Sequence, residues 1–164
     1  MTSAYDIANY FLAKDADHTV FNKKVISRNG RNFYEGNARL NKYLHISQNL
    51  YIAKTGEKLF DEDLYAFDNG GVIPTIQKNY SVLLNRSKKF NLDKEKTDFL
   101  DRVYYILKNA DIDELIEASH EDSAWKEKSN NYYLDKEQMN SLGHADEYKK
   151  QYSDMLKVMD SLTL

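Results

Sequence analysis

The stretch NARLNKYLHISQNLYIAKTG, residues 37–56, contains the most regular helical pattern of the chain. Asn37 is a favourable residue before the first turn of a helix, and Gly56 is suited to the left-handed conformation that ends one. Between them, apolar side chains recur every three or four residues, which is the spacing of one helix face. The pattern predicts a central helix whose core positions include Leu40, Tyr43, Leu44, Ile46, Leu50 and Tyr51.

Two further elements are predicted on the N-terminal side of this helix. Ser3 can cap a first helix with an apolar stripe that ends near Leu12. Asn29 and Gly30 lie between two short β-favouring stretches, residues 24–28 and 31–34. This dipeptide tolerates the positive φ angles of a type I′ turn, so we expect a β-hairpin centred on it.

Helices also dominate the C-terminal side. The stretch Asn69-Gly70-Gly71 predicts a tight turn, and Pro74 suits the first turn of a helix that continues through Leu84. Two more helices follow from caps at Asp93 and Asp111, and a last one from the apolar face after residue 143. We therefore expect a mainly α fold, a compact helical domain with a small β-hairpin or short β elements.

Composition limits the class of protein. The 164 residues are 41% hydrophobic and 30% charged, which is enough apolar surface for a folded core. A net charge of −3 argues against a nucleic-acid-binding role. The sequence contains no cysteine, which removes thiolate chemistry and fits a cytoplasmic protein. No apolar run reaches the length of a membrane span, so we expect neither secretion nor membrane insertion.

No pattern in the sequence predicts catalysis. The four histidines do not form a metal-binding pair, and His45 is better explained as a buried or interface residue. The acidic run at residues 61–63 lacks the spacing of a calcium loop. Phosphate-binding loops and nucleophile elbows are missing from the sequence as well. We expect no catalytic residue, cofactor or metal, although paired carboxylates of a hydrolase remain open at this stage.

Several stretches together resemble the Panacea domain, the family of SocA-like antitoxins and phage-associated proteins. The start at residues 5–11 is similar to the start of these domains. Residues 40–48 resemble the family's stretch Leu-x-Lys-Leu-Leu-Tyr-x-x-Gln, with Lys42 and Gln48 in matching places. Residues 55–60 and 64–74 resemble its Gly-x-x-Leu-Phe and Ala-Trp-x-x-Gly-Pro-Val-x-Pro blocks. Residues 115–125 resemble its Leu-x-x-x-x-His-x-x-x-x-Trp segment.

The resemblance implies that residues 1–164 form a single Panacea-like domain that binds a protein partner. The partner-binding residues suggested by the matching blocks are Lys42, Gln48, Phe67, Asn69, Gly70, Pro74, His120 and Trp125. Most of these residues also have a purely structural explanation. Lys42 and Gln48 can be solvated helix positions, Gly70 and Pro74 a plain turn, Trp125 a core anchor, and His120 a residue that packs the end of one helix onto another. Phe67 and Gly71 depart from the family pattern, which has tryptophan and proline there.

The hairpin is an addition relative to the family pattern. Variable loops on a rigid scaffold usually carry recognition, so Asn29, Gly30 and Arg31 are expected to determine specificity.

The favoured function is a non-catalytic antitoxin that neutralises a toxin by direct contact. The alternative is a phage-encoded inhibitor of a host or defence protein that uses the same fold. A hydrolase is less favoured, because nothing in the sequence positively supports a pair of catalytic carboxylates. A DNA-binding autoregulator is less favoured, because the basic cluster Arg86, Lys88 and Lys89 is small. A homodimer is left open.

Overall fold

A computed structural model describes residues 2–129 and 136–164 of the chain. Within these ranges the fold is mainly α with two small antiparallel sheets, as predicted. The elements in chain order are α1 (Ala4–Lys14), β1 (Val25–Arg28), β2 (Arg31–Tyr34), α2 (Glu35–Thr55), β3 (Tyr65–Phe67), β4 (Gly70–Val72), α3 (Pro74–Lys78), α4 (Tyr80–Asn85), α5 (Lys94–Leu107), α6 (Ile112–His120), α7 (Ser123–Ser129), η1 (Leu142–His144), α8 (Ala145–Gln151) and α9 (Ser153–Ser161).

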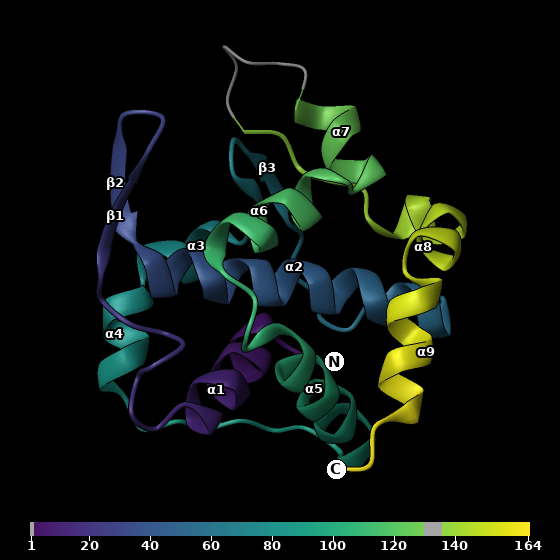
Figure 1. Ribbon diagram of the computed structural model, residues 1–164, viewed down its shortest axis with the longest axis horizontal. Coiled ribbons are helices and arrows are strands. Elements are labelled where there is room, and N and C mark those ends of the chain that lie inside the picture. The colour runs from purple at the N-terminus through teal and green to yellow at the C-terminus, as the bar shows by residue number, and fades with distance from the viewer. Residues whose placement is uncertain (1, 130–135) are drawn as a thin grey trace.

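Helix α2 is the axis of the fold. It runs through the middle of the molecule, with α1 and α5 below it, α6 beside it and α8 and α9 across its C-terminal end (Figure 1). Tyr43, Leu44, Ile46 and Leu50 are at most 1% exposed, which confirms their predicted place in the core. Gly56 ends the helix with a φ of 78°, as expected of a left-handed cap.

The start of α2 differs from the prediction. The helix begins at Glu35 and not after Asn37, because the second strand of the hairpin runs directly into it. Tyr34 ends that strand and is the residue that precedes the helix. The backbone N–H of Glu35 donates to the carbonyl of Lys24 at 2.8 Å, which satisfies one of the free donors of the first turn.

Side-chain caps place the other long helices as predicted. The Ser3 hydroxyl accepts a hydrogen bond from the N–H of Tyr5 at the start of α1. Asp93 accepts from the N–H of Lys96 at the start of α5. Asp111 and Glu114 form a reciprocal capping box at the start of α6.

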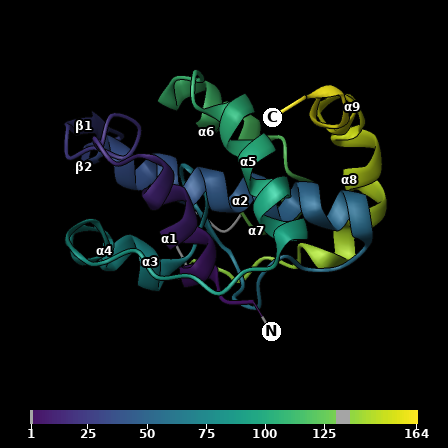
Figure 2. The ribbon, with the colours of Figure 1, turned by 90° about the horizontal axis from the view of Figure 1, so that it is seen from below.

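Two expected continuous helices are each divided in two. The helix that begins at Pro74 is interrupted at Asn79, and the C-terminal helix is interrupted at Tyr152. Both helix pairs change direction at the break (Figures 1 and 2). Of their segments, α3 and α8 lie against α2, and α9 lies against both α2 and α5. Trp125 lies on a further short helix, α7, that the sequence did not predict.

Both sheets are two-stranded hairpins. In the first, Asn29 and Gly30 have φ angles of 52° and 76°, which confirms the predicted turn between β1 and β2. The second pairs β3 with β4 and was expected to turn at its glycines. Asp68 and Asn69 form the turn instead, and the glycines lie in β4. The described part of the chain contains no helix that is long and apolar enough to cross a membrane.

Candidate functional site: a pocket between two β-hairpins

A buried polar stripe on α2 supports the site. Five polar side chains spaced three or four residues apart, or adjacent, are each at most 1% exposed: Asn41, Lys42, His45, Gln48 and Asn49. Most of them bind backbone groups of segments that lie against the helix. Gln48 accepts from the N–H of Leu59 at 2.7 Å and donates to the carbonyl of Phe60 at 3.0 Å. Asn41 accepts from the N–H of Ile73 at 3.0 Å. The stripe thus replaces water at buried backbone groups.

The turn between β3 and β4, residues 67–71, is held by side chains from three helices. The indole Nε1 of Trp125 donates to the carbonyl of Phe67 at 2.8 Å. Nε2 of His120 lies 2.8 Å from the carbonyl of Asp68, which is a hydrogen bond when that nitrogen carries the proton. Burial lowers the pKa of His120, so the neutral ring is favoured. The rings of His120 and Trp125 also stack, with centroids 4.2 Å apart.

Lys42 of α2 holds the same turn from the side of that helix. Its Nζ donates to the carbonyl of Gly71 at 2.9 Å, and burial lowers the pKa of Lys42 to about 7. The hydroxyl of Ser119 also donates to the carbonyl of Asn69 at 3.3 Å, so four of the five carbonyls in residues 67–71 accept a hydrogen bond from a side chain distant in sequence. We call residues 67–71 the clamped turn. These hydrogen bonds fix the backbone of the clamped turn.

Close packing explains the glycine at position 70. Its φ is 112°, which favours glycine, and an added Cβ would lie 2.1 Å from Oγ of Ser119 and 3.0 Å from Cε of Lys42. A larger residue would push the clamped turn away from α2 and α6. Gly70 is thus a support of the site rather than a contact surface.

Behind the clamped turn, His45 and Asp122 form the centre of a buried network. The N–H of Gly71 donates to Nδ1 of His45 at 3.1 Å, so the ring proton is on Nε2 and points to Asp122 at 2.5 Å. Asp122 also accepts from the amide of Asn49 at 2.8 Å and from the hydroxyl of Tyr148 at 2.6 Å. Burial acts to raise the pKa of Asp122, but these hydrogen bonds outweigh it and lower the pKa to about 2.

This network is structural, because the side chains of His45 and Asp122 are both fully buried. It connects α2 with β4, with the start of α7 and, through Tyr148, with α8. A substrate has no access to the pair. A histidine and a carboxylate also form the catalytic dyad of some enzymes. Because His45 and Asp122 are out of reach of a substrate, their pairing gives no reason to assign a reaction here.

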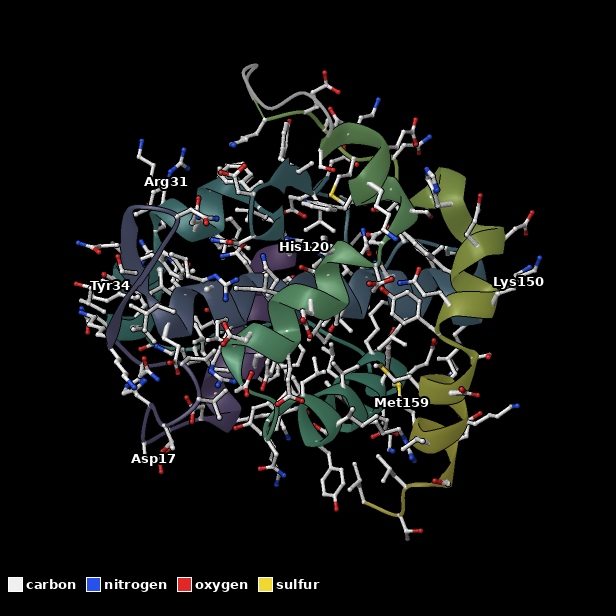
Figure 3. All side chains as sticks on the ribbon, turned by 45° about the horizontal axis from the view of Figure 1, so that its top comes forward. Asp17, Arg31, Tyr34, His120, Lys150 and Met159 are labelled. Atoms are coloured by element: carbon white, nitrogen blue, oxygen red, sulfur yellow. The ribbon has the colours of Figure 1, made fainter. Side chains whose placement is uncertain are left out.

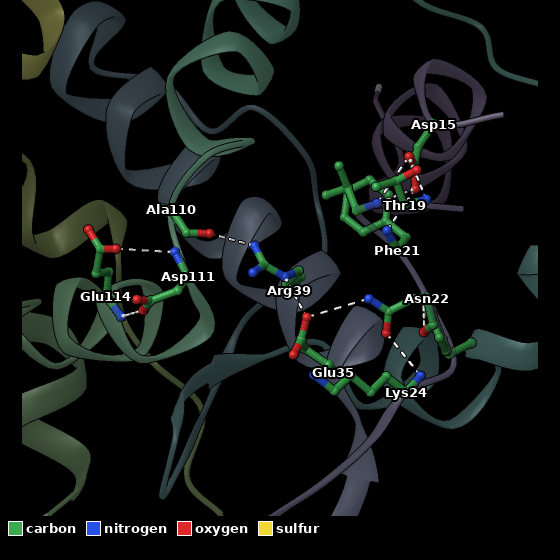
Figure 4. Close-up of polar contacts among 12 residues, drawn as sticks. Asp15, Thr19, Phe21, Asn22, Lys24, Glu35, Arg39, Ala110, Asp111 and Glu114 are labelled. Atoms are coloured by element: carbon green, nitrogen blue, oxygen red, sulfur yellow. Dashed lines mark hydrogen bonds and ion pairs between the residues drawn. The ribbon is translucent and has the colours of Figure 1, made fainter. Parts of the chain in front are cut away.

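The base of the β1–β2 hairpin is fixed to the start of α2. Glu35 accepts hydrogen bonds from Asn22 at 3.4 Å and from Arg39 at 3.3 Å, and Arg39 also donates to the carbonyl of Ala110 at 2.6 Å (Figure 4). Asp15 accepts from three consecutive backbone N–H groups, residues 19–21, in the loop that leads to the hairpin. These contacts set the direction in which the hairpin leaves the body.

A pocket of about 180 Å³ lies between this hairpin and the clamped turn. The first half of α2 contributes to its lining, including Lys42. Its basic side chains are Lys42 and two arginines of the hairpin, Arg28 and Arg31. Arg28 forms an ion pair with Asp113 of α6. Asp68, the acidic residue of the lining, forms an ion pair with Lys136 at 3.2 Å.

The pocket brings together residues that were predicted from separate parts of the sequence. Five of them line it: Asn29, Arg31, Lys42, Phe67 and Asn69. Figure 3 shows Arg31 on the hairpin at the edge of the molecule and His120 nearer the middle.

The other predicted residues have supporting places. His120 and Trp125 hold the clamped turn from behind, Gln48 binds the loop at residues 59–60, and Pro74 is the first residue of α3. Gly30 lies in the hairpin turn itself. The alternative explanation of Lys42 and Gln48 as solvated helix positions was wrong, since both are buried.

Sequence reasoning did not identify Asp122, Asn49 and Asn41 as parts of the supporting network. Asn41 and Asn49 could have been predicted as buried polar residues. They continue the helical spacing of Lys42, His45 and Gln48, and the helix also has apolar residues on all its faces, which is typical of a buried helix. Asp122 had none, because its partners lie far away in the sequence. Among the described residues, no group of three or more histidine, aspartate or glutamate side chains is arranged to hold a metal ion.

Comparison with known families finds one match. A model of the family described as antitoxin SocA-like, Panacea domain, matches residues 40–126. The matched part includes most of α2, the clamped turn, α6 and the first turn of α7 with Trp125, whereas the β1–β2 hairpin precedes it. Nothing among curated proteins or solved structures matches the chain. Because the match covers more than half of the chain, this protein belongs to the SocA-like antitoxin, or Panacea domain, family.

Proposed function

We propose that this protein is a non-catalytic antitoxin that neutralises a toxin protein by direct, stoichiometric contact at the pocket between the hairpin and the clamped turn. Family membership supports an antitoxin-type role. We choose this surface because five of the candidate residues line one pocket there: Asn29, Arg31, Lys42, Phe67 and Asn69.

The two walls of the pocket suit different tasks. The clamped turn lies in the part of the chain that matches the family, and its backbone is fixed by Trp125, His120 and Lys42. The hairpin lies outside the matched part and presents exposed side chains such as Asn29 and Arg31. A fixed wall provides affinity at low entropic cost, and a variable wall distinguishes partners.

The pocket alone is too small for a stable protein complex. A specific interface buries at least about 1,000 Å² in total, so the contact has to extend over the outer surfaces of both hairpins. A second hollow, lined by Val25, Phe33 and Tyr34 among others, adjoins the pocket along the hairpin and provides apolar surface for such a contact.

A titration of toxin activity tests the proposal. A candidate toxin is sought among the products of the reading frames next to this gene. The purified candidate is mixed with the protein at ratios from about 0.1 to 10, and residual toxin activity is followed over time. A stoichiometric inhibitor gives an end point fixed by the ratio, together with a complex that persists in gel filtration. Complete loss of activity at tenfold toxin excess without a lasting complex would show that the protein acts catalytically.

A further inference from the structure

The charge of the chain is distributed unevenly, and the hairpin has the positive part. Residues 19–34 contain four basic residues, Lys23, Lys24, Arg28 and Arg31, and no acidic residue. The segment thus has a charge of +4. Since the net charge of the whole chain is −3, the rest of the chain has a net charge of −7. Five residues of this segment, Arg28, Asn29, Arg31, Asn32 and Phe33, form one wall of the pocket. Two of them are arginines, so an occupant of negative charge is attracted to this wall.

Within that wall, Arg31 is the cation that is free to bind. Arg28 is already paired with Asp113, and Asp68 across the pocket is paired with Lys136. Arg31 lines the pocket, is exposed, and forms no hydrogen bond or ion pair with any residue in the ranges that the structure describes. Its guanidinium can therefore bind a carboxylate in the two-pronged geometry that suits arginine.

The rest of the lining suits a carboxylate as well. The buried Lys42 lies at the floor, and several asparagine side chains, among them Asn32 and Asn69, offer amide N–H groups. A volume of about 180 Å³ holds one side chain rather than a folded segment. Nucleic acid is disfavoured, because its affinity comes from many phosphates along an extended basic surface, whereas these basic residues are confined to one hairpin.

We infer that the pocket binds a single acidic side chain, aspartate or glutamate, of the protein partner, with Arg31 as its main ion-pair donor. The inference rests on the proposed function and specifies the chemistry of the partner at the same site. The neighbouring hollow with Val25, Phe33 and Tyr34 then takes the residues next to the acidic one.

A blocked peptide tests this inference without the toxin. Acetyl-Ala-Glu-Ala-amide and its glutamine counterpart are titrated into the ¹⁵N-labelled full-length protein, and amide shifts of residues 28–33 and 67–69 are recorded. The glutamate peptide is expected to bind about tenfold more tightly than the glutamine peptide, because a charged hydrogen bond is lost in the latter. Arg31→Gln should abolish the difference, whereas Lys24→Gln, an equal charge change outside the pocket lining, should keep it.

Two results would overturn the inference. One is equal binding of the two peptides, or a difference that survives Arg31→Gln. The other is tighter binding of inorganic phosphate than of the glutamate peptide at the same amides, which would make the pocket a phosphate site.

Neutralisation assays separate this inference from the proposed function. Arg31→Glu should weaken toxin neutralisation at least about tenfold more than Lys24→Glu, since both change the overall field equally and only Arg31 lines the pocket. If the two variants neutralise equally well, the inference fails while the proposed function stands. If the unmodified protein does not neutralise at all, the proposed function fails, and the peptide titration still decides whether the pocket binds carboxylates.

Discussion

Nε1 of Trp125 donates a hydrogen bond to the backbone carbonyl of Phe67 at 2.8 Å, although 58 residues separate them in the sequence. Phe67 is also the residue at which the chain departs from the tryptophan typical of the family. Its carbonyl belongs to the turn that forms one wall of the pocket, so Trp125 acts on the site from outside it.

Trp125→Phe should lower the free energy of unfolding by about 0.5–1.5 kcal/mol, the range for one lost hydrogen bond, while the ring can still stack on His120. Urea unfolding followed by circular dichroism measures the change. Tyr105→Phe, at a side chain that is 47% exposed, is the matched control and should cost less than about 0.5 kcal/mol. Equal losses in the two variants would mean that the Trp125 hydrogen bond does not hold the turn.

Asp122→Asn should destabilise the protein by about 3 kcal/mol. The substitution keeps the size of the side chain, but one carboxylate oxygen becomes an amide NH₂. In one orientation this NH₂ faces the donors of His45 and Asn49, and in the other it faces the backbone N–H of Ala124, so buried donors lose their acceptor either way. Asp113→Asn removes a carboxylate that is largely exposed and serves as the control, with an expected loss below about 1 kcal/mol. A loss below about 1 kcal/mol for Asp122→Asn would show that the network is not essential to the fold.

Lys42 predicts a pH dependence of stability between about pH 7 and 10. Burial lowers the pKa of Lys42 to about 7 in the folded protein, against 10.5 for an unperturbed lysine. Between these values the unfolded chain binds more protons, so the free energy of unfolding rises with pH. Relative to Lys42→Met, unfolding of the unmodified protein should become harder by up to about 1.4 kcal/mol per pH unit from pH 7.5 to 9.5. Parallel pH profiles for the two proteins would contradict a buried lysine with a lowered pKa.

Leu44→Ala should cost about 2–5 kcal/mol, because Leu44 is fully buried at the centre of α2. Val158→Ala, at a side chain that is 51% exposed, should cost less than about 0.5 kcal/mol. We propose that residues 1–164 form one domain, so a single unfolding transition is expected for both variants. A loss below about 0.5 kcal/mol for Leu44→Ala would mean that α2 is not the axis of the core.

The helix ends and the turn that depend on a cap or turn residue were predicted from the sequence. Asn29-Gly30, Gly56, Asp93 and Asp111 each act within a few residues, and all four are found where expected. The helix breaks at Asn79 and Tyr152 were missed, because no glycine or proline marks them and packing on α2 decides their position.

The site was predictable only in part for the same reason. Lys42, Phe67 and Asn69 were suggested by the family resemblance, and Asn29 and Arg31 by the turn between two strands. Their meeting around one pocket depends on how the hairpin is anchored by Glu35 and how the turn is held by Trp125, which are contacts between distant residues. A sequence pattern within one helix or strand cannot predict contacts between residues far apart in the chain.

A shortened β1–β2 hairpin shows whether the toxin binds at this pocket. Val25 and Tyr34 are paired across the two strands, so deletion of residues 26–28 and 31–33 leaves Asn29-Gly30 as a two-residue turn between them. The deletion removes the hairpin wall of the pocket and keeps the backbone bond from Glu35 to Lys24.

The shortened protein is compared with the full-length one in thermal unfolding and in titration against the toxin. We predict a melting temperature within about 5 °C of that of the full-length protein, since the hairpin lies outside the core, and at least about a hundredfold loss of neutralising affinity. A shortened protein that neutralises the toxin with the same end point and the same affinity would contradict the claim that the partner binds at this pocket.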